Sequence, residues 1–140
     1  MTAQVIEVVA ALVRDEAGRV LLVRKRGTSA FMQPGGKREA DEGDVAALMR
    51  ELDEELGCRV LPETAQHLGE FQVPAANEPG QEVRAALYAV EVAGAIVPSA
   101  EIDELRWVDP QVMPDLDLAP LTRDYVLPLA AADEDEEGGG

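Results

Sequence analysis

The segment DVAALMRELDEEL, Asp44 to Leu56, predicts a helix with an apolar stripe and an acidic stripe side by side. At 100° per residue, Glu55 falls about 40° and Glu54 about 60° from Glu51, so the three carboxylates share one stripe. The apolar stripe that must face a core consists of Val45, Leu48, Met49, Leu52 and Leu56. The carboxylates therefore border the packed face, where a cleft is expected, and Gly57 is expected to end the helix.

Mutual repulsion within the acidic stripe needs a counterion. Like charges at i,i+3 and i,i+4 each destabilise an isolated helix by roughly 0.2–0.5 kcal/mol. Arg50 can pair with Glu54 one turn later, but the stretch holds no lysine to neutralise the other acids. A divalent cation such as Mg²⁺ prefers oxygen ligands and would offset the repulsion. The alternative is an acidic face that is only solvated.

The loop before the helix, QPGGKREADEGD, contains paired glycines that let another group approach the backbone closely. The carbonyl of Gly35 is a candidate neutral ligand beside the carboxylates, although the same residues also suit an ordinary turn. The loop is not a Walker P-loop, because Arg38 follows Gly36-Lys37 where that motif needs Ser or Thr. A single histidine, His67, leaves few parts for a zinc site.

Together the loop and helix resemble the complete Nudix box. The order is Gly36, five residues of any type, Glu42, seven residues, and then RELDEELGC, Arg50 to Cys58. Every fixed position matches except the last, where Cys58 replaces an aliphatic residue, and a buried cysteine behaves as a small hydrophobe. The resemblance implies an α/β/α sandwich, of the α/β (α+β) class, with a mixed sheet between helices. It also implies that Gly36, Glu42 and Gly57 hold the geometry of the box.

The Nudix family hydrolyses nucleoside diphosphates linked to another moiety, with Mg²⁺ or Mn²⁺. By this resemblance Glu51, Glu54 and Glu55 carry the metal, with the Gly35 carbonyl assisting, and Arg50 orients a glutamate by a salt bridge. Mg²⁺ is the expected cofactor, with Mn²⁺ as the alternative. The family often takes a further catalytic acid from a loop outside the box. The segment SAEIDELRW offers Glu101 and Glu104, of which Glu101 is preferred.

Candidate substrate-binding residues lie upstream of the box. Five of the 12 basic residues fall between residues 24 and 38, which suggests phosphate contacts by Arg26 and Lys37. A solvated strand edge protected by charge is the alternative. Phe31 is the first choice for stacking on a base, although core packing is open for any aromatic residue. Asn77 or Glu78 in AANEPG are further candidates to line a cleft.

The rest of the chain predicts strands followed by a closing helix. The segments VIEVVAALV and VLLVRKR predict two strands that form a hairpin around DEAGR, and FMQPGG predicts a third short strand. HLGEFQV, VRAALYAVEV and ELRWVDP predict later strands, and LAPLTRDYVLPLAA predicts a helix with Pro120 in its first turn. We expect a single domain over residues 1–130 and an acidic, glycine-rich flexible tail over residues 131–140.

The net charge of the chain disfavours some classes of binding partner. The chain has 140 residues and a net charge of −16, which disfavours a nucleic-acid polymer or an anionic membrane surface as a partner. A small nucleotide that arrives with its own cation is not disfavoured. The single Cys58 excludes an intrachain disulfide, and with no signal-like N-terminus a cytoplasmic location is expected. The resemblance alone suggests a homodimer.

Three classes of function remain open. The leading one is a metal-dependent nucleotide pyrophosphohydrolase, of the sanitising type that removes damaged (oxidised) nucleoside triphosphates. Hydrolysis of ADP-ribose or another nucleoside-diphosphate sugar is the alternative within the enzyme class, and Pro74, sixteen residues past Cys58, points weakly to it. A nucleotide-sensing Nudix module without turnover, or a structural interaction domain, would belong to another class. All three box glutamates remain, which favours the enzyme.

Overall fold

Strand β1 (Gln4–Leu12) runs through the middle of the fold and is apolar on both faces from Val8 to Leu12. Val9 and Ala11 pack with one cluster of buried residues, and Ala10 and Leu12 pack with the other. This alternation follows from the two-residue period of a strand, and burial of both faces explains the unbroken apolar run in the sequence. The computed structural model describes residues 4–75 and 79–138.

The strands form two sheets. The four-stranded sheet has the order β4-β1-β6-β5, and β1 is parallel to β6 but antiparallel to β4. The three-stranded sheet has the order β3-β2-β7. The strands other than β1 are β2 (Val20–Lys25), β3 (Phe31–Met32), β4 (Gly35–Lys37), β5 (Arg59–Pro74), β6 (Gln81–Ala93) and β7 (Ile102–Val108).

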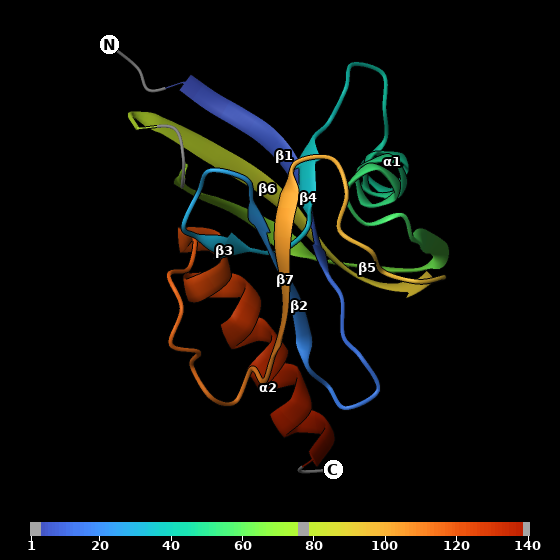
Figure 1. The fold of residues 1–140 in the computed structure, drawn as a ribbon, viewed down its shortest axis with the longest axis vertical. Helices are drawn as coiled ribbons and strands as arrows, with labels where there is room; N and C mark the ends of the chain where they lie inside the picture. Colours follow the sequence, from blue (N-terminus) through green and yellow to red (C-terminus); the bar gives the residue numbers. More distant parts are fainter. Residues whose placement is uncertain (1–3, 76–78, 139–140) are drawn as a thin grey trace.

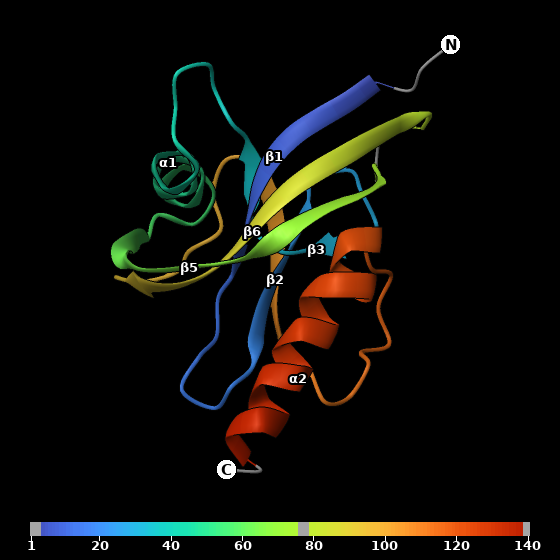
Figure 2. The ribbon, with the colours of Figure 1, turned by 180° about the vertical axis from the view of Figure 1, so that it is seen from behind.

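Helices cover the sheets on opposite sides, as Figures 1 and 2 show. Helix α1 (Asp44–Leu56) buries Leu48, Leu52 and Leu56 in the cluster that contains Val9 and Ala11. The C-terminal helix starts at Pro120, continues as a π-helical stretch η1 (Thr122–Val126) and ends as α2 (Leu127–Gly138). Its apolar residues join the cluster that contains Ala10 and Leu12. The predicted α/β/α arrangement is therefore confirmed, with two sheets in the middle layer.

Both predicted ends of the box helix are confirmed. Gly57 has a φ of 65° and donates its N–H to the carbonyl of Asp53 at 2.9 Å, which ends α1 in a left-handed cap. Ala47, one helical turn before Glu51, is fully buried in the core. Glu55 is also buried, so the helix lies deeper than its apolar stripe alone predicts.

The predicted hairpin of the first two strands is wrong beyond its turn. The N–H of Leu21 does bond the carbonyl of Val13 at 2.9 Å, next to the turn. Beyond it, β1 pairs with β4 and β6 while β2 pairs with β3 and β7, so the two strands enter different sheets. The reason is that both edges of each strand are taken by other partners. At the other end of the chain, α2 carries helical backbone to Gly138, through the predicted tail.

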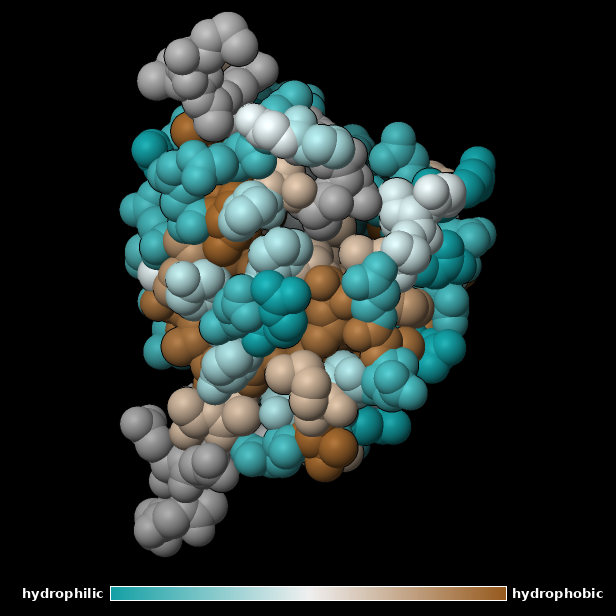
Figure 3. All heavy atoms as spheres, turned by 90° about the vertical axis from the view of Figure 1, so that its left-hand side faces the viewer, coloured by the Kyte–Doolittle hydropathy of each residue, from teal (hydrophilic) through white to brown (hydrophobic). Residues whose placement is uncertain are grey.

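The surface in Figure 3 shows apolar patches between hydrophilic side chains on the side that lies at the left of Figure 1. No helix within residues 4–75 and 79–138 is long and apolar enough to span a membrane.

Candidate active site

The site is built around two glycines in β4. Gly35 has a φ of 143°, and a Cβ on it would overlap the carbonyl oxygen of Val9. A Cβ on Gly36 would overlap the carboxylate of Glu51. The β4 backbone therefore lies between β1 and the acidic face of α1: the β1 backbone leaves no room for a side chain at Gly35, and a side chain at Gly36 would displace the Glu51 carboxylate. This close approach gives a physical reason for the paired glycines of the box.

Arg50 connects the loop to the helix. Its guanidinium donates to both carboxylate oxygens of Glu42 at 2.8 Å, to Glu51 Oε1 at 2.8 Å and to the carbonyl of Lys37 at 3.0 Å. These hydrogen bonds lower the pKa of Glu42 to about 2. The ion pair with Glu54, at 3.8 Å, is longer. Arg50 thus fixes the Glu51 side chain and the loop at once, because its planar fork serves several acceptors.

Glu55 is a buried carboxylate without a strong partner. Glu55 is only 7% exposed, and its carboxylate accepts one long hydrogen bond, 3.4 Å, from the N–H of Gly35. Burial raises the pKa of Glu55 to about 7, and the charges of Glu51 and Glu101 act in the same direction. The Gly35 bond and the charge of Lys25 oppose that rise. A buried acid of this kind favours a cation beside it.

The predicted metal ligands are neighbours, but they do not form an assembled site. The Glu54 side chain is 57% exposed, and Glu51 is held by Arg50. Within the part of the chain that the structure describes, no group of three His, Cys, Asp or Glu residues is placed to hold a metal ion. The donor set of carboxylates and a glycine carbonyl still fits a hard cation in chemistry. Side-chain rotation of Glu51 and Glu54 would be needed to gather it.

Of the two acids outside the box, Glu101 lies nearer the site. The charge of Glu101 helps to raise the pKa of Glu55. The backbone carbonyl of Glu101 accepts a hydrogen bond from the N–H of Arg26 at 2.7 Å. Glu104 instead pairs with Arg106 at 2.7 Å and with Arg24 at 3.3 Å. The loop that carries Glu101 is attached to the end of α1, where Ser99 bonds the carbonyls of Glu54 and Glu55.

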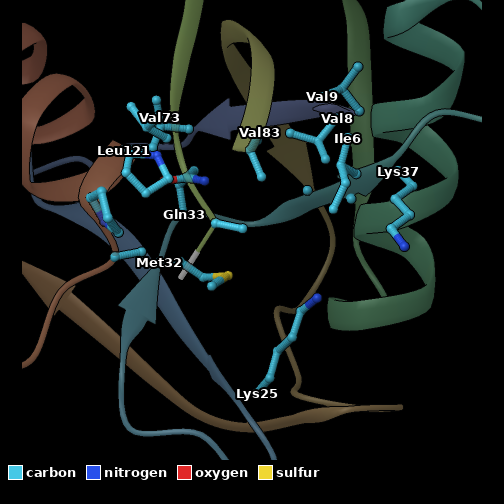
Figure 4. A pocket seen from close by; sticks show the side chains of 16 residues that line it. Ile6, Val8, Val9, Lys25, Met32, Gln33, Lys37, Val73, Val83 and Leu121 are labelled. Carbon is cyan, nitrogen blue, oxygen red and sulfur yellow. The ribbon is translucent and has the colours of Figure 1, made fainter. Parts of the chain in front are cut away.

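A pocket opens beside the two glycines (Figure 4). Its basic end is formed by Lys25, Gly35, Gly36 and Lys37. Its apolar end is formed by Met32, Gln33, Val73, Val83 and Leu121. Figure 4 shows the two lysines at a distance from Val73 and Leu121, with Ile6 and Val8 beside Lys37, so both charges lie at one end of the pocket and that end also has an apolar wall. Two carboxylates lie next to this basic end: that of Glu51 packs against Gly36, and that of Glu55 accepts a hydrogen bond from Gly35.

The basic residues reach this pocket differently from the prediction. Lys37, one of the predicted substrate-binding residues, lines the pocket. Arg26 does not, because its guanidinium bonds the carbonyl of Ala100 at 3.3 Å. Lys25 takes that place. The alternation of side chains along β2 could have identified Lys25. Leu21 and Val23 face α1, and Lys25 lies two residues further along the same face.

Phe31 is a core residue. It is 5% exposed and packs in the cluster under the C-terminal helix, so its ring offers no open face to a base. The structure does not support Phe31 as the stacking residue. The next residue, Met32, lines the pocket instead, since successive strand residues face opposite ways. Asn77 and Glu78 lie outside the described residues.

Sequence reasoning missed Gln33 and Thr122 as well. Gln33 lines the apolar end, and the Thr122 hydroxyl donates to its Oε1 at 2.7 Å. These two residues are 89 positions apart in the sequence, so no local sequence pattern predicts their contact.

Comparison with known proteins gives the same result as the box. The family model for the NUDIX domain matches residues 5–129. A protein of Haemophilus influenzae named 8-oxo-dGTP diphosphatase is 35% identical over 78 residues, which make up 53% of this chain. The match spans only 57% of that relative.

Solved structures share the fold along nearly the whole chain. The solution structure of the E. coli ORF135 protein is 29% identical with a TM-score of 0.71, covering 98% of this chain and 94% of that one. The crystal structure of the MutT protein from Methanosarcina mazei Go1 is 23% identical with a TM-score of 0.77, covering 96% and 98%. Nudix hydrolases generally use divalent metals and act on small nucleotide substrates. With its box, fold and family match in agreement, the chain belongs to the Nudix family.

Proposed function

We propose that this enzyme cleaves a phosphoanhydride bond of a nucleoside diphosphate linked to another group, and that it acts on damaged nucleoside triphosphates. The observation that carries the proposal is the two-ended pocket, with Lys25 and Lys37 at one end and apolar side chains at the other. A polyphosphate suits the basic end and a base suits the apolar end. The related 8-oxo-dGTP diphosphatase supports the sanitising type.

Mg²⁺, with Mn²⁺ as the alternative, is the proposed cofactor. Glu51, Glu54, Glu55 and the Gly35 carbonyl would hold it, and the weak pairing of buried Glu55 supports this assignment. When bound, the cation would neutralise charge on the phosphates and lower the pKa of a water molecule.

The side chains of the protein have separate tasks in this proposal. Lys25 and Lys37 bind the phosphate oxygens, and Arg50 keeps Glu51 in place through their 2.8 Å hydrogen bond. A carboxylate must take the proton from the attacking water. Glu55 and Glu101 are the two candidates for that role, since Glu55 adjoins the basic end through Gly35 and the charge of Glu101 acts on Glu55.

An alternative substrate within the same class is ADP-ribose or another nucleoside-diphosphate sugar. Pro74, which the sequence singled out for such substrates, lines the pocket beside Val73. A nucleotide sensor without turnover is the alternative of another class. A cytoplasmic location, the absence of nucleic-acid and membrane partners, and a homodimer remain predictions; the net charge of −16 supports the second.

The decisive experiment measures phosphate and nucleotide release with Mg²⁺ over a panel of nucleotides. The panel contains normal and oxidised triphosphates, ADP-ribose and dinucleoside polyphosphates, with Glu54→Gln beside the wild type. Preferred turnover of oxidised triphosphates that collapses in Glu54→Gln supports the proposal. Preferred turnover of ADP-ribose establishes the alternative substrate. Metal-dependent binding with no turnover of any compound overturns the enzyme proposal in favour of a sensor.

A further inference from the structure

The apolar end of the pocket contains one uncharged polar side chain, Gln33, among its described lining residues. Gln33 follows β3 and is half-buried. In Figure 4 it lies with Val73 and Leu121, away from Lys25 and Lys37. A lone carboxamide among apolar groups is well placed to select a ligand, because the other side chains that line this end of the pocket offer a ligand no hydrogen bonds.

Thr122 fixes the orientation of that carboxamide. Thr122 has no exposed surface, and its hydroxyl donates to Gln33 Oε1 at 2.7 Å. The two residues come from different parts of the fold, the loop after β3 and the first π-helical turn of the C-terminal helix. Since Oε1 accepts from Thr122, the amide nitrogen Nε2 is directed to another partner.

That partner is missing among the described residues. None of them accepts a hydrogen bond from Gln33 Nε2. The described part of the chain also contains no fully buried side-chain nitrogen or oxygen without a partner, so Nε2 is accessible from the pocket. Gln33 thus presents an N–H donor at the end of the pocket that suits a base.

We propose that Gln33 is a specificity-determining residue that donates from Nε2 to an acceptor on the substrate base, with Thr122 as its positioning residue. The inference rests on the proposed function and names its substrate class: bases with an oxo group at the edge that faces Gln33. An amino group at the same place would bring donor against donor and leave both unpaired. The enzyme therefore prefers oxo bases to their amino counterparts.

The test uses pairs of triphosphates that differ in this edge, dITP with dATP and dUTP with dCTP. The ratio of kcat/KM, oxo to amino, is measured within each pair for the wild type, Gln33→Glu and Thr122→Val. We expect at least a tenfold oxo preference in one pair, and loss or reversal of that ratio in Gln33→Glu, which replaces the donor with an acceptor. Thr122→Val should weaken the preference about threefold or more, and Thr122→Ser should restore it.

The controls separate selection from folding. Gln66→Glu makes the same change of charge on an exposed side chain of β5 outside the pocket lining and should keep the wild-type ratio. Thermal unfolding shows whether each variant is folded. An oxo-to-amino ratio that stays within twofold of wild type in folded Gln33→Glu overturns the inference.

Failure of the proposed function would look different. If the wild type hydrolyses no triphosphate, the same ratios are taken from equilibrium binding of dIMP against dAMP and dUMP against dCMP. A tenfold oxo preference that Gln33→Glu removes then supports the role of Gln33 without turnover, and equal binding in both proteins overturns it.

Discussion

The two ends of the pocket are assembled in different ways. The basic end and its adjoining carboxylates come mostly from one continuous segment, residues 35–57, in which Gly36, Glu51 and Arg50 lie close in sequence. The apolar end combines residues from the loop after β3, from β5, from β6 and from the C-terminal helix. The difference teaches that a local motif can supply the reactive groups, while selection of the substrate depends on how distant segments meet.

The largest expected effect is at the carboxylates. Glu55→Gln should lower kcat about 1,000-fold with saturating Mg²⁺, because it removes a buried charge that either holds the metal or takes a proton. Asp53→Asn, on the exposed side of the same helix, is the matched control and should keep nearly full activity. A Glu55→Gln enzyme with more than a tenth of wild-type kcat would contradict this assignment.

The second effect is a pH dependence of stability without metal. The folded pKa of Glu55, about 7, lies above its usual 4.5, so the folded state holds the proton longer than the unfolded state. The free energy of unfolding should therefore fall as pH rises from 4.5 through 7, by up to about 3 kcal/mol.

Urea unfolding with a chelator at pH 5 and pH 8 measures this change. Glu55→Gln should remove most of the difference between the two pH values, and Asp53→Asn should retain it. Equal pH dependence in wild type and Glu55→Gln would show that Glu55 does not carry the effect.

Arg50→Lys tests the connection between loop and helix. Lysine cannot bond both Glu42 oxygens and Glu51 together, so kcat/KM should fall about 10- to 100-fold, mainly through kcat. Arg19→Lys, in an exposed ion pair with Asp15, is the control for the same chemical change. A normal kcat in Arg50→Lys would rule out a positioning role.

Lys25 and Arg26 are neighbours with different surroundings. Lys25→Met should raise KM about tenfold, because it removes a charge from the basic end. Arg26→Met should leave KM within twofold, since its guanidinium bonds Ala100 outside the pocket. If Arg26→Met has the larger effect, the original sequence-based choice is right.

Phe31→Leu should have the smallest effect on function. The smaller side chain in the core should lower the free energy of unfolding by about 1 kcal/mol, as measured in urea. The oxo-to-amino ratios should stay at their wild-type values. A changed ratio would place Phe31 in the recognition of the base after all.

The features that the sequence predicts correctly depend on interactions between residues that are close in the chain. Helix α1 and its Gly57 cap follow from residues within a few turns of one another, whereas Arg50 pairs more closely with Glu42 and Glu51 than with Glu54, the partner that helix spacing predicts. The burial of Glu55 was less predictable, because the helix angle alone cannot say how deeply β1 and β4 enclose it.

The sequence by itself determined the reactive segment, because the spacing of glycines, arginine and glutamates places them on one loop and one helix face. Only the tertiary structure decided that β1 and β2 enter different sheets, that Lys25 rather than Arg26 reaches the pocket, and that Phe31 joins the core. It also brought Gln33 to Thr122. These outcomes depend on contacts between distant segments, and local sequence patterns carry no record of such contacts.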